Sequence, residues 1–252
     1  MITWGILRSL AIYYGVPGKG KRLRQFYAPL VPPNSLCFDI GAHVGDRTRA
    51  WVALGARVIA VEPQPAFVWL LRLLYGRFSQ VTILQAALGS QPGEAYLYIS
   101  QRTPTLSTLS AEWQTCIRTN QRFRKARWNQ HITVPVLTLD TLITRYGLPA
   151  FCKIDVEGYE LEVLRGLSTP IPALSFEYVP AVIEIALACI HRLASLGPYQ
   201  FNWSEGEQLT WRSAHWLTAA EMSACLQQLS PLDNSGDVYA CLPTVAPELV
   251  PE

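Results

Sequence analysis

The chain has few of the features that assign a protein to a class by composition alone. Its formal net charge is only +2, so the overall balance favours neither bulk nucleic-acid binding nor an acidic tail. No apolar run reaches the roughly 20 residues of a membrane helix, and there is no internal repeat or low-complexity segment. What remains is a chain of 252 residues, half of them hydrophobic and 16% charged, which can bury a substantial core.

The sequence also lacks a CxxC pair. Several of its cysteines lie in apolar runs such as SLCFDI, AFCKID and VYACL. This placement favours buried, reduced thiols over disulfides or zinc ligands, and it predicts a reducing compartment such as the cytoplasm. The cysteines are Cys37, Cys116, Cys152, Cys189, Cys225 and Cys241.

Residues 1–33 are predicted to form a helical extension ahead of a main domain at 34–252. Arg8 interrupts the first apolar run, and the basic cluster at residues 19–24 follows that run instead of preceding it, so we do not expect a signal peptide. We expect a short amphipathic helix and then a basic turn, packed on the domain or over a ligand. Peripheral contact with a membrane is the alternative for this segment.

From residue 34 onward, apolar segments of strand length alternate with segments of helical spacing. The strand candidates show no internal alternation of polar residues, which is typical of a parallel sheet covered by helices on both faces. The sequence therefore predicts an α/β, Rossmann-like fold, with YQFNWSE and DVYACL as a closing pair that includes an antiparallel edge. The predicted strands include 35–41, 56–63, 81–89, 94–100, 151–158 and 173–179, and the predicted helices include 43–55, 65–78, 159–167, 182–196 and 218–229.

A segment at about 101–131 differs from the rest because it is polar and basic and carries two tryptophans. We interpret it as an insert between repeating units. Its basic run, RTNQRFRKARW, is expected to be a solvated loop, with the binding of an acidic substrate as the alternative.

The first predicted strand ends in a glycine turn, DIGAHVGDRT, and the second strand ends at Glu62. Gly41 and Gly45 allow a sharp turn, and a carboxylate at the next strand end can accept both hydroxyls of a ribose. His43 stands where a dinucleotide fingerprint needs its middle glycine, and Asp39 would repel a diphosphate. The turn therefore favours S-adenosylmethionine and disfavours a nicotinamide oxidoreductase.

Six segments, in this order, carry a family likeness: FDIGAHVGDRT, VIAVEPQP, LQAALGS, STLS, VPVLTLDTLI and KIDVEGYELEVLRG. Together they resemble the FkbM family of S-adenosylmethionine-dependent methyltransferases over about residues 35–177. The resemblance implies a class I methyltransferase fold with a seven-stranded, mostly parallel sheet and one antiparallel strand near the edge. It also implies a cofactor site in which Glu62 holds the ribose. The other predicted cofactor residues are Asp39, Gly41, Ala42, His43, Gly45, Pro63, Ala86 and Ala87.

The resemblance leaves the acceptor open. It implies O-methylation of a hydroxyl on a sugar, glycan or natural product. The alternative is N-methylation of a protein side-chain amide, such as the asparagine of a phycobiliprotein-like substrate, and an acidic protein is then the partner. A cofactor-binding subunit without catalysis is a third hypothesis, and nucleic acid is disfavoured. The oligomeric state is not predicted.

Three carboxylates at strand ends are the candidates for chemistry. We predict that Asp155, Glu157 and Glu177 converge and that they position the acceptor and remove its proton. The alternatives are that Asp155 is a helix N-cap and that Glu157 is only a first-turn acid. We expect no metal, with a divalent cation on the three carboxylates as the alternative. Glu160 and Glu162 are expected to lie on the solvated helix surface.

Three further residues are predicted to contact the substrate. Ser107 and Thr108 belong to the STLS segment, for which an N-cap of the following helix is the alternative. His131 follows the basic insert and is predicted to face the substrate.

Overall fold

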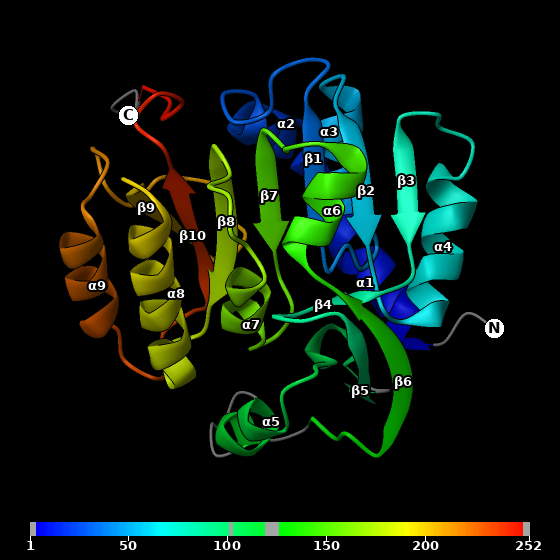
Figure 1. Cartoon of the computed structure of the whole chain (residues 1–252). Coiled ribbons are helices and arrows are strands. Elements are labelled where there is room, and N and C mark those ends of the chain that lie inside the picture. Colours follow the sequence, from blue (N-terminus) through cyan, green and yellow to red (C-terminus); the bar gives the residue numbers. More distant parts are fainter. Residues whose placement is uncertain (1–3, 101–102, 119–125, 249–252) are drawn as a thin grey trace.

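The computed structural model describes residues 4–100, 103–118 and 126–248, and its centre is a seven-stranded sheet (Figure 1). The strands are β1 (Leu36–Ile40), β2 (Arg57–Val61), β3 (Val81–Leu84), β7 (Phe151–Ile154), β8 (Ala173–Tyr178), β9 (Gln200–Glu205) and β10 (Gly236–Cys241). Their order in the sheet is β3-β2-β1-β7-β8-β10-β9. Neighbouring strands are parallel except where β10 pairs with β8 and β9. The predicted α/β fold is confirmed, with its antiparallel strand next to the edge.

Helices cover both faces of this sheet, because successive side chains of a buried strand point to opposite sides. The helices are α2 (Lys19–Tyr27), α3 (Asp46–Ala53), α4 (Pro65–Tyr75), α6 (Leu139–Tyr146), α7 (Glu160–Arg165), α8 (Ile183–Leu196) and α9 (Ala219–Gln227). On one face, Phe38 of β1 belongs to the same core as apolar residues of α6, α7, α8 and α9. On the other face, its neighbour Cys37 packs in a core with Leu23 of α2 and Trp51 of α3. The apolar character of the strands is therefore explained by burial on both sides.

A second sheet lies at the carboxyl ends of the central strands (Figure 1). It consists of β4 (Ala87–Leu88), β6 (Gln130–Leu137) and β5 (Gly93–Ile99), in that order, and α5 (Ala111–Arg118) lies beside it. The prediction of one strand over 81–89 was wrong. β3 ends at Leu84, and the chain then leaves the large sheet so that β4 pairs with β6. Residues 119–125, which contain most of the predicted basic run, lie outside the described residues.

The N-terminal segment contains α1 (Trp4–Tyr14) and α2. The prediction of a basic turn at residues 19–24 was wrong, because these residues belong to α2. Leu23 and Tyr27, one helical turn apart, are buried in the core beneath α2, which gives the helix its packing face. The break between the helices falls before Gly18, whose φ of 77° is in the left-handed region. No helix in the described part of the chain combines the length and apolar character that crossing a membrane requires.

Candidate active site

A pocket lies at the carboxyl ends of β1, β2 and β7. This is the point where the strand order changes direction, since β2 and β3 lie to one side of β1 and β7 and β8 lie to the other. Ligands of open α/β sheets bind at such a position. Among the predicted site residues, those that line the pocket are Asp39, Gly41, Ala42, His43, Glu62, Pro63, Ala86, Ala87, Ser107, Asp155 and Glu157.

The glycine turn after β1 forms one wall of the pocket. Gly41 has a φ of 80°, and a Cβ added there would lie 1.9 Å from the carbonyl oxygen of Asp155, so only glycine fits. Its backbone nitrogen donates to Val61 O at 2.9 Å, which joins the ends of β1 and β2. Gly45 does not line the pocket. A Cβ on Gly45 would lie 2.7 Å from side-chain atoms of Leu71 and Tyr75, so this glycine allows α4 to pack against the turn.

Asp39 stabilises the same turn through hydrogen bonds with Thr48. Its Oδ2 accepts hydrogen bonds from Thr48 N at 3.1 Å and from Thr48 Oγ1 at 2.5 Å, which fixes the first turn of α3. Burial raises the pKa of Asp39 to about 6, although the bonds from Thr48 oppose this shift. The carboxylate therefore has a structural partner and also faces the pocket.

Glu62 is a deeply buried carboxylate of the pocket, with 2% of its surface exposed, as is Asp39. Its Oε2 accepts from His43 N and its Oε1 accepts from Gln64 N, each at 2.9 Å. Burial raises its pKa to about 7, against the lowering effect of these bonds. Each carboxylate oxygen of Glu62 accepts one backbone hydrogen bond and can accept another. The side chain can therefore bind two hydroxyl groups at once.

His43 contributes to the site mainly through its backbone. Its φ is 49°, and its ring packs against Phe67 at a centroid distance of 4.2 Å and against Tyr13 at 5.6 Å. Burial lowers the pKa of the imidazole to about 4, so the ring is neutral near pH 7. Its Nε2 is buried without a hydrogen-bond partner. The residue thus lines the pocket as predicted, as an aromatic surface and as the donor to Glu62.

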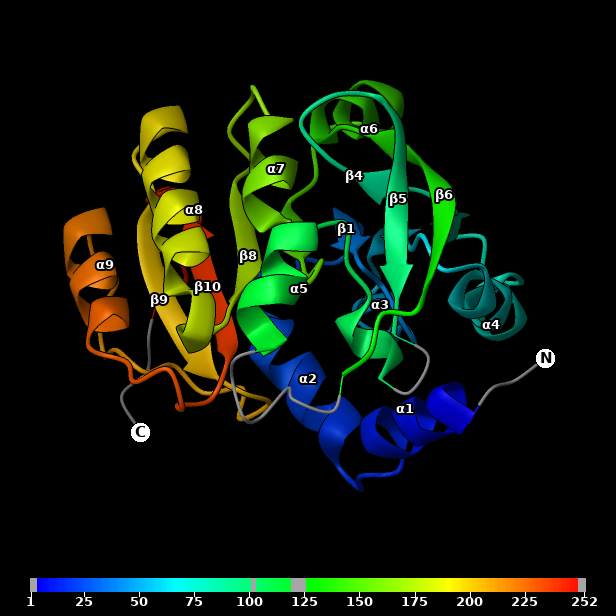
Figure 2. The same cartoon turned by 90° about the horizontal axis from the view of Figure 1, so that it is seen from below.

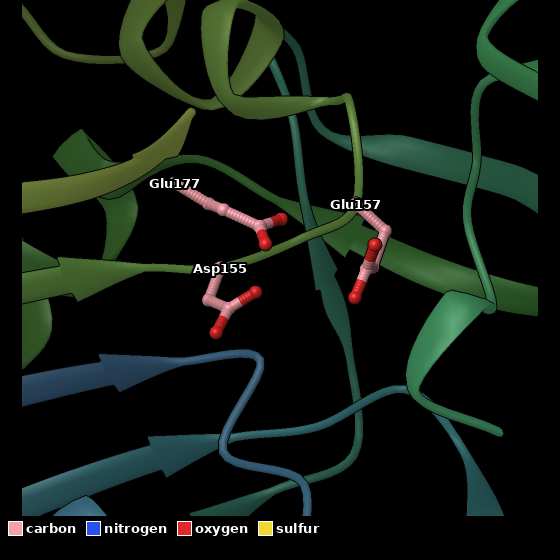
Figure 3. A group of neighbouring side chains, drawn as sticks. All are labelled: Asp155, Glu157 and Glu177. Atoms are coloured by element: carbon pink, nitrogen blue, oxygen red, sulfur yellow. The ribbon is translucent and has the colours of Figure 1, made fainter. Parts of the chain in front are cut away.

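Asp155, Glu157 and Glu177 point toward one another, as Figure 3 shows. One carboxylate oxygen from each lies within 4.8 Å of the other two. Asp155 follows β7 and Glu177 is in β8, so two adjacent parallel strands bring their ends together. Asp155 and Glu157 line the pocket, whereas Glu177 stands behind them. The predicted convergence is confirmed.

The electrostatics of this group come from burial and from charge repulsion. Burial, then the negative charge of Asp155, raises the pKa of Glu157 well above its ordinary range. Burial, then Glu157 and Asp155, does the same for Glu177, whose Oε2 has no hydrogen-bond partner. Oxygens this close either share protons or bind a hard cation. The pKa of Glu157 and the pKa of Glu177 therefore both lie above that of an exposed glutamate.

Lys153 is a site residue that the sequence analysis missed. Although it lies within the buried strand β7, its Nζ is 2.5 Å from Asp155 Oδ2 and 3.7 Å from Asp237 Oδ1. Burial lowers the pKa of Lys153, but Asp155 and Asp237 outweigh it and raise the pKa above its ordinary value. A lysine inside the apolar run FCKIDV was the signal, because a buried lysine needs a carboxylate partner.

The loop that carries Glu157 is held by Glu160, and the prediction that Glu160 is solvated was wrong. Glu160 is 2% exposed, and its Oε1 accepts from Val156 N at 3.1 Å and from Gly158 N at 3.2 Å. Asp155 is not a helix N-cap, since Tyr159 precedes α7. Glu157 itself has a φ of 56°, a left-handed conformation that this loop imposes.

The residues predicted to contact the substrate do not all lie at the pocket. Ser107 lines the pocket and donates to Gln64 Oε1 at 3.2 Å. Thr108 is fully buried, outside the pocket lining, where it bridges to Tyr98 of β5. Ser110 caps α5 by accepting from Trp113 N, which is the alternative considered for this segment. His131 is exposed on β6 beside Tyr96 and does not line the pocket.

Comparison with family models identifies a methyltransferase FkbM domain over residues 39–185, which is more than half of the chain. The chain belongs to the FkbM methyltransferase family. As a member, it is an S-adenosylmethionine-dependent methyltransferase. Comparison with curated protein sequences gives no match.

Comparison with solved structures gives matches of low sequence identity, and three methyltransferases are among them. A putative O-methyltransferase from Klebsiella pneumoniae is 9% identical, with 95% of this chain and 90% of that chain covered and a TM-score of 0.44. An O-methyltransferase from Bacillus cereus, in complex with SAH, is 11% identical, with 94% and 89% covered and a TM-score of 0.41. Precorrin-6y C5,15-methyltransferase from Geobacter metallireducens is 12% identical, with 88% and 86% covered and a TM-score of 0.44.

The pocket of this FkbM protein suits the cofactor of its family. S-adenosylmethionine carries a sulfonium, an ammonium and a ribose, and the pocket offers the buried carboxylates Asp39 and Glu62. The cations that line it already have partners, since Lys153 pairs with Asp155 and Arg47 pairs with Asp46 at 2.7 Å. The remaining negative charge favours a cationic ligand.

The raised pKa of Glu62 predicts a specific dependence of stability on pH. In the unfolded chain Glu62 loses its proton near pH 4.5, whereas in the folded protein it does so near pH 7. Between these values the folded state binds more protons, so the free energy of unfolding falls as the pH rises. We expect denaturant melts at pH 5 and pH 8 to show that this fall is smaller in Glu62→Gln, by up to about 3 kcal/mol. Equal falls in wild type and variant would contradict the shift.

Proposed function

We propose that this FkbM methyltransferase methylates a hydroxyl group on a sugar, glycan or natural product. The observation that carries the proposal is the group of three carboxylates beside the pocket, two of which line it. A hydroxyl is a poor nucleophile near neutral pH, so its methylation gains from a base within reach. S-adenosylmethionine, when bound, supplies an electrophilic methyl group.

Each acid has a separate part in the proposed reaction. Asp155, held at 2.5 Å by Lys153, accepts a hydrogen bond from the acceptor and orients it. Glu157, which lines the pocket, would take the proton of the hydroxyl, whose oxygen would accept the methyl group that bound S-adenosylmethionine supplies. Glu177 stabilises the arrangement by sharing a proton with Glu157. The raised pKa of Glu157 makes it a stronger base once it is ionised.

The proposed cofactor residues combine the family resemblance with the lining of the pocket. Glu62 binds the ribose hydroxyls, and the turn of Gly41, Ala42 and His43 lines the methionine part. Ala86 and Ala87, with Pro63, form the apolar wall beside the adenine. The scheme uses no metal ion, so treatment with EDTA is expected to leave the rate unchanged.

The test is to incubate the protein with methyl-labelled S-adenosylmethionine and a native cell extract. We expect label in a small-molecule or glycan fraction that is stable to protease, and none with Glu157→Gln. Label that protease releases as methylated amino-acid residues would instead support the protein amide reaction. If the protein binds the cofactor but no fraction of the extract becomes labelled, the proposed acceptor class is contradicted, while the assignment of the pocket to the cofactor still stands.

A further inference from the structure

Helix α1 packs on α4 and is fixed in that position. Leu10 of α1 lies against the core formed by Phe67 and Leu70 of α4. Tyr14 donates to Val44 O at 2.8 Å, and its hydroxyl lies 2.5 Å from that of Tyr75. Figures 1 and 2 both show α1 and α4 as neighbours at the end of the molecule where the chain begins. These contacts use one side of each helix.

Large apolar side chains are exposed on both helices and in the residues just after each helix. Trp69 is 51% exposed and Leu73 is 63% exposed on α4, and Ile12 is 48% exposed on α1. Such a concentration of exposed large apolar side chains marks an interaction surface. We define the α1–α4 face by its exposed apolar residues, which are seven of the eleven exposed large hydrophobic residues in the described part of the chain: Leu7, Ile12, Val16, Trp69, Leu73, Leu74 and Phe78.

The charge of this region has one sign. Residues 1–38 and 63–93 contain no aspartate or glutamate, although the whole chain is almost neutral. The exposed basic side chains of α1, α2 and α4, and of the residues just after α4, therefore have no acidic neighbours on the same segments. The basic residues concerned are Arg8, Lys21, Arg22, Arg72 and Arg77.

We propose that the α1–α4 face binds the surface of a membrane that contains anionic lipids. Apolar side chains, a tryptophan among them, enter the boundary of the acyl chains, while the basic side chains contact the lipid phosphates. A second copy of the chain is a poorer occupant, because a two-fold contact would place these cations against their own copies. Tyr13 of the same helix lines the pocket, so docking through α1 holds the pocket beside the bilayer.

The experiment is co-sedimentation of the full chain with vesicles, which needs no enzymatic activity. We expect binding to vesicles of equal parts phosphatidylcholine and phosphatidylglycerol, and no binding to pure phosphatidylcholine. The double variant Trp69→Ser/Leu73→Ser removes apolar surface from the membrane contact and is expected to weaken binding by at least about tenfold. The exposure of both residues keeps the fold intact, and the matched control is Leu232→Ser, which is 71% exposed outside the face.

A second variant tests the charges. Arg72→Gln/Arg77→Gln is expected to weaken binding by about tenfold or more, and added salt should have the same effect on the wild type. The proposal is overturned if the wild type ignores the anionic vesicles, or if the double variants bind as the wild type does. It is also overturned if sedimentation shows a dimer that Trp69→Ser/Leu73→Ser dissociates. None of these outcomes depends on which acceptor is methylated.

Discussion

Replacing Glu157 by glutamine is expected to lower the turnover number by roughly 10²–10⁴-fold, the usual contribution of a positioned general base. Glutamine keeps the size of the side chain but cannot take a proton. Because the proposed partner of the ribose is Glu62 and Glu157 belongs to the group of three carboxylates, binding of S-adenosylmethionine should persist. Initial rates of methyl transfer and a calorimetric titration with the cofactor measure the two quantities separately.

Glu112→Gln is the matched control, since Glu112 is exposed on α5 and does not line the pocket. Turnover in Glu157→Gln at the level of this control would show that Glu157 is not the base. Asp155→Asn is a less clear test. It removes the carboxylate 2.5 Å from the buried ammonium of Lys153, which then keeps only Asp237 as its partner, so the variant changes the stability of the protein as well as its activity.

Glu62→Gln is expected to weaken binding of S-adenosylmethionine by about 10- to 100-fold, the range for losing hydrogen bonds to a charged group. An amide has one acceptor oxygen where the carboxylate has two. That oxygen also has to satisfy the backbone donors His43 and Gln64, which now hold the two carboxylate oxygens of Glu62. Calorimetry on the wild type and the variant at pH 8, where Glu62 is ionised, gives the ratio.

Glu94→Gln serves as the control here, because Glu94 is exposed on β5. An affinity for Glu62→Gln equal to that of the control would mean that the ribose lies elsewhere. If the affinity falls and the thermal stability does not, the effect belongs to the contact with the ligand and not to a disturbed loop.

The sequence was sufficient to predict the parts of the site that follow from strand ends. Asp39, Glu62, Asp155 and Glu177 lie at or directly after the ends of parallel strands, so the topology alone brings them to one edge of the sheet. Gly41 was predictable for the same reason, because the chain must turn sharply where it approaches the end of β7. At these positions the local sequence pattern and the topology of the fold predict the same placement.

The parts that were missed depend on contacts between distant segments. Nothing in the local pattern shows that the carboxylate of Glu160 turns back to the backbone of residues 156–158. Gly45 looked like a cofactor glycine, but its space is taken by Leu71 and Tyr75 of α4. Tyr13 reaches the pocket only because α1 folds onto α4. Such residues are identified by tertiary packing and not by spacing along the chain.

The most direct test of this account is a crystal structure of the protein with S-adenosylhomocysteine. The account predicts the product in the pocket at the ends of β1, β2 and β7, with both ribose hydroxyls within hydrogen-bond distance of Glu62. It also predicts that the sulfur faces Asp155 and Glu157. A product bound in another place, or one whose sulfur points away from these two carboxylates, would contradict it.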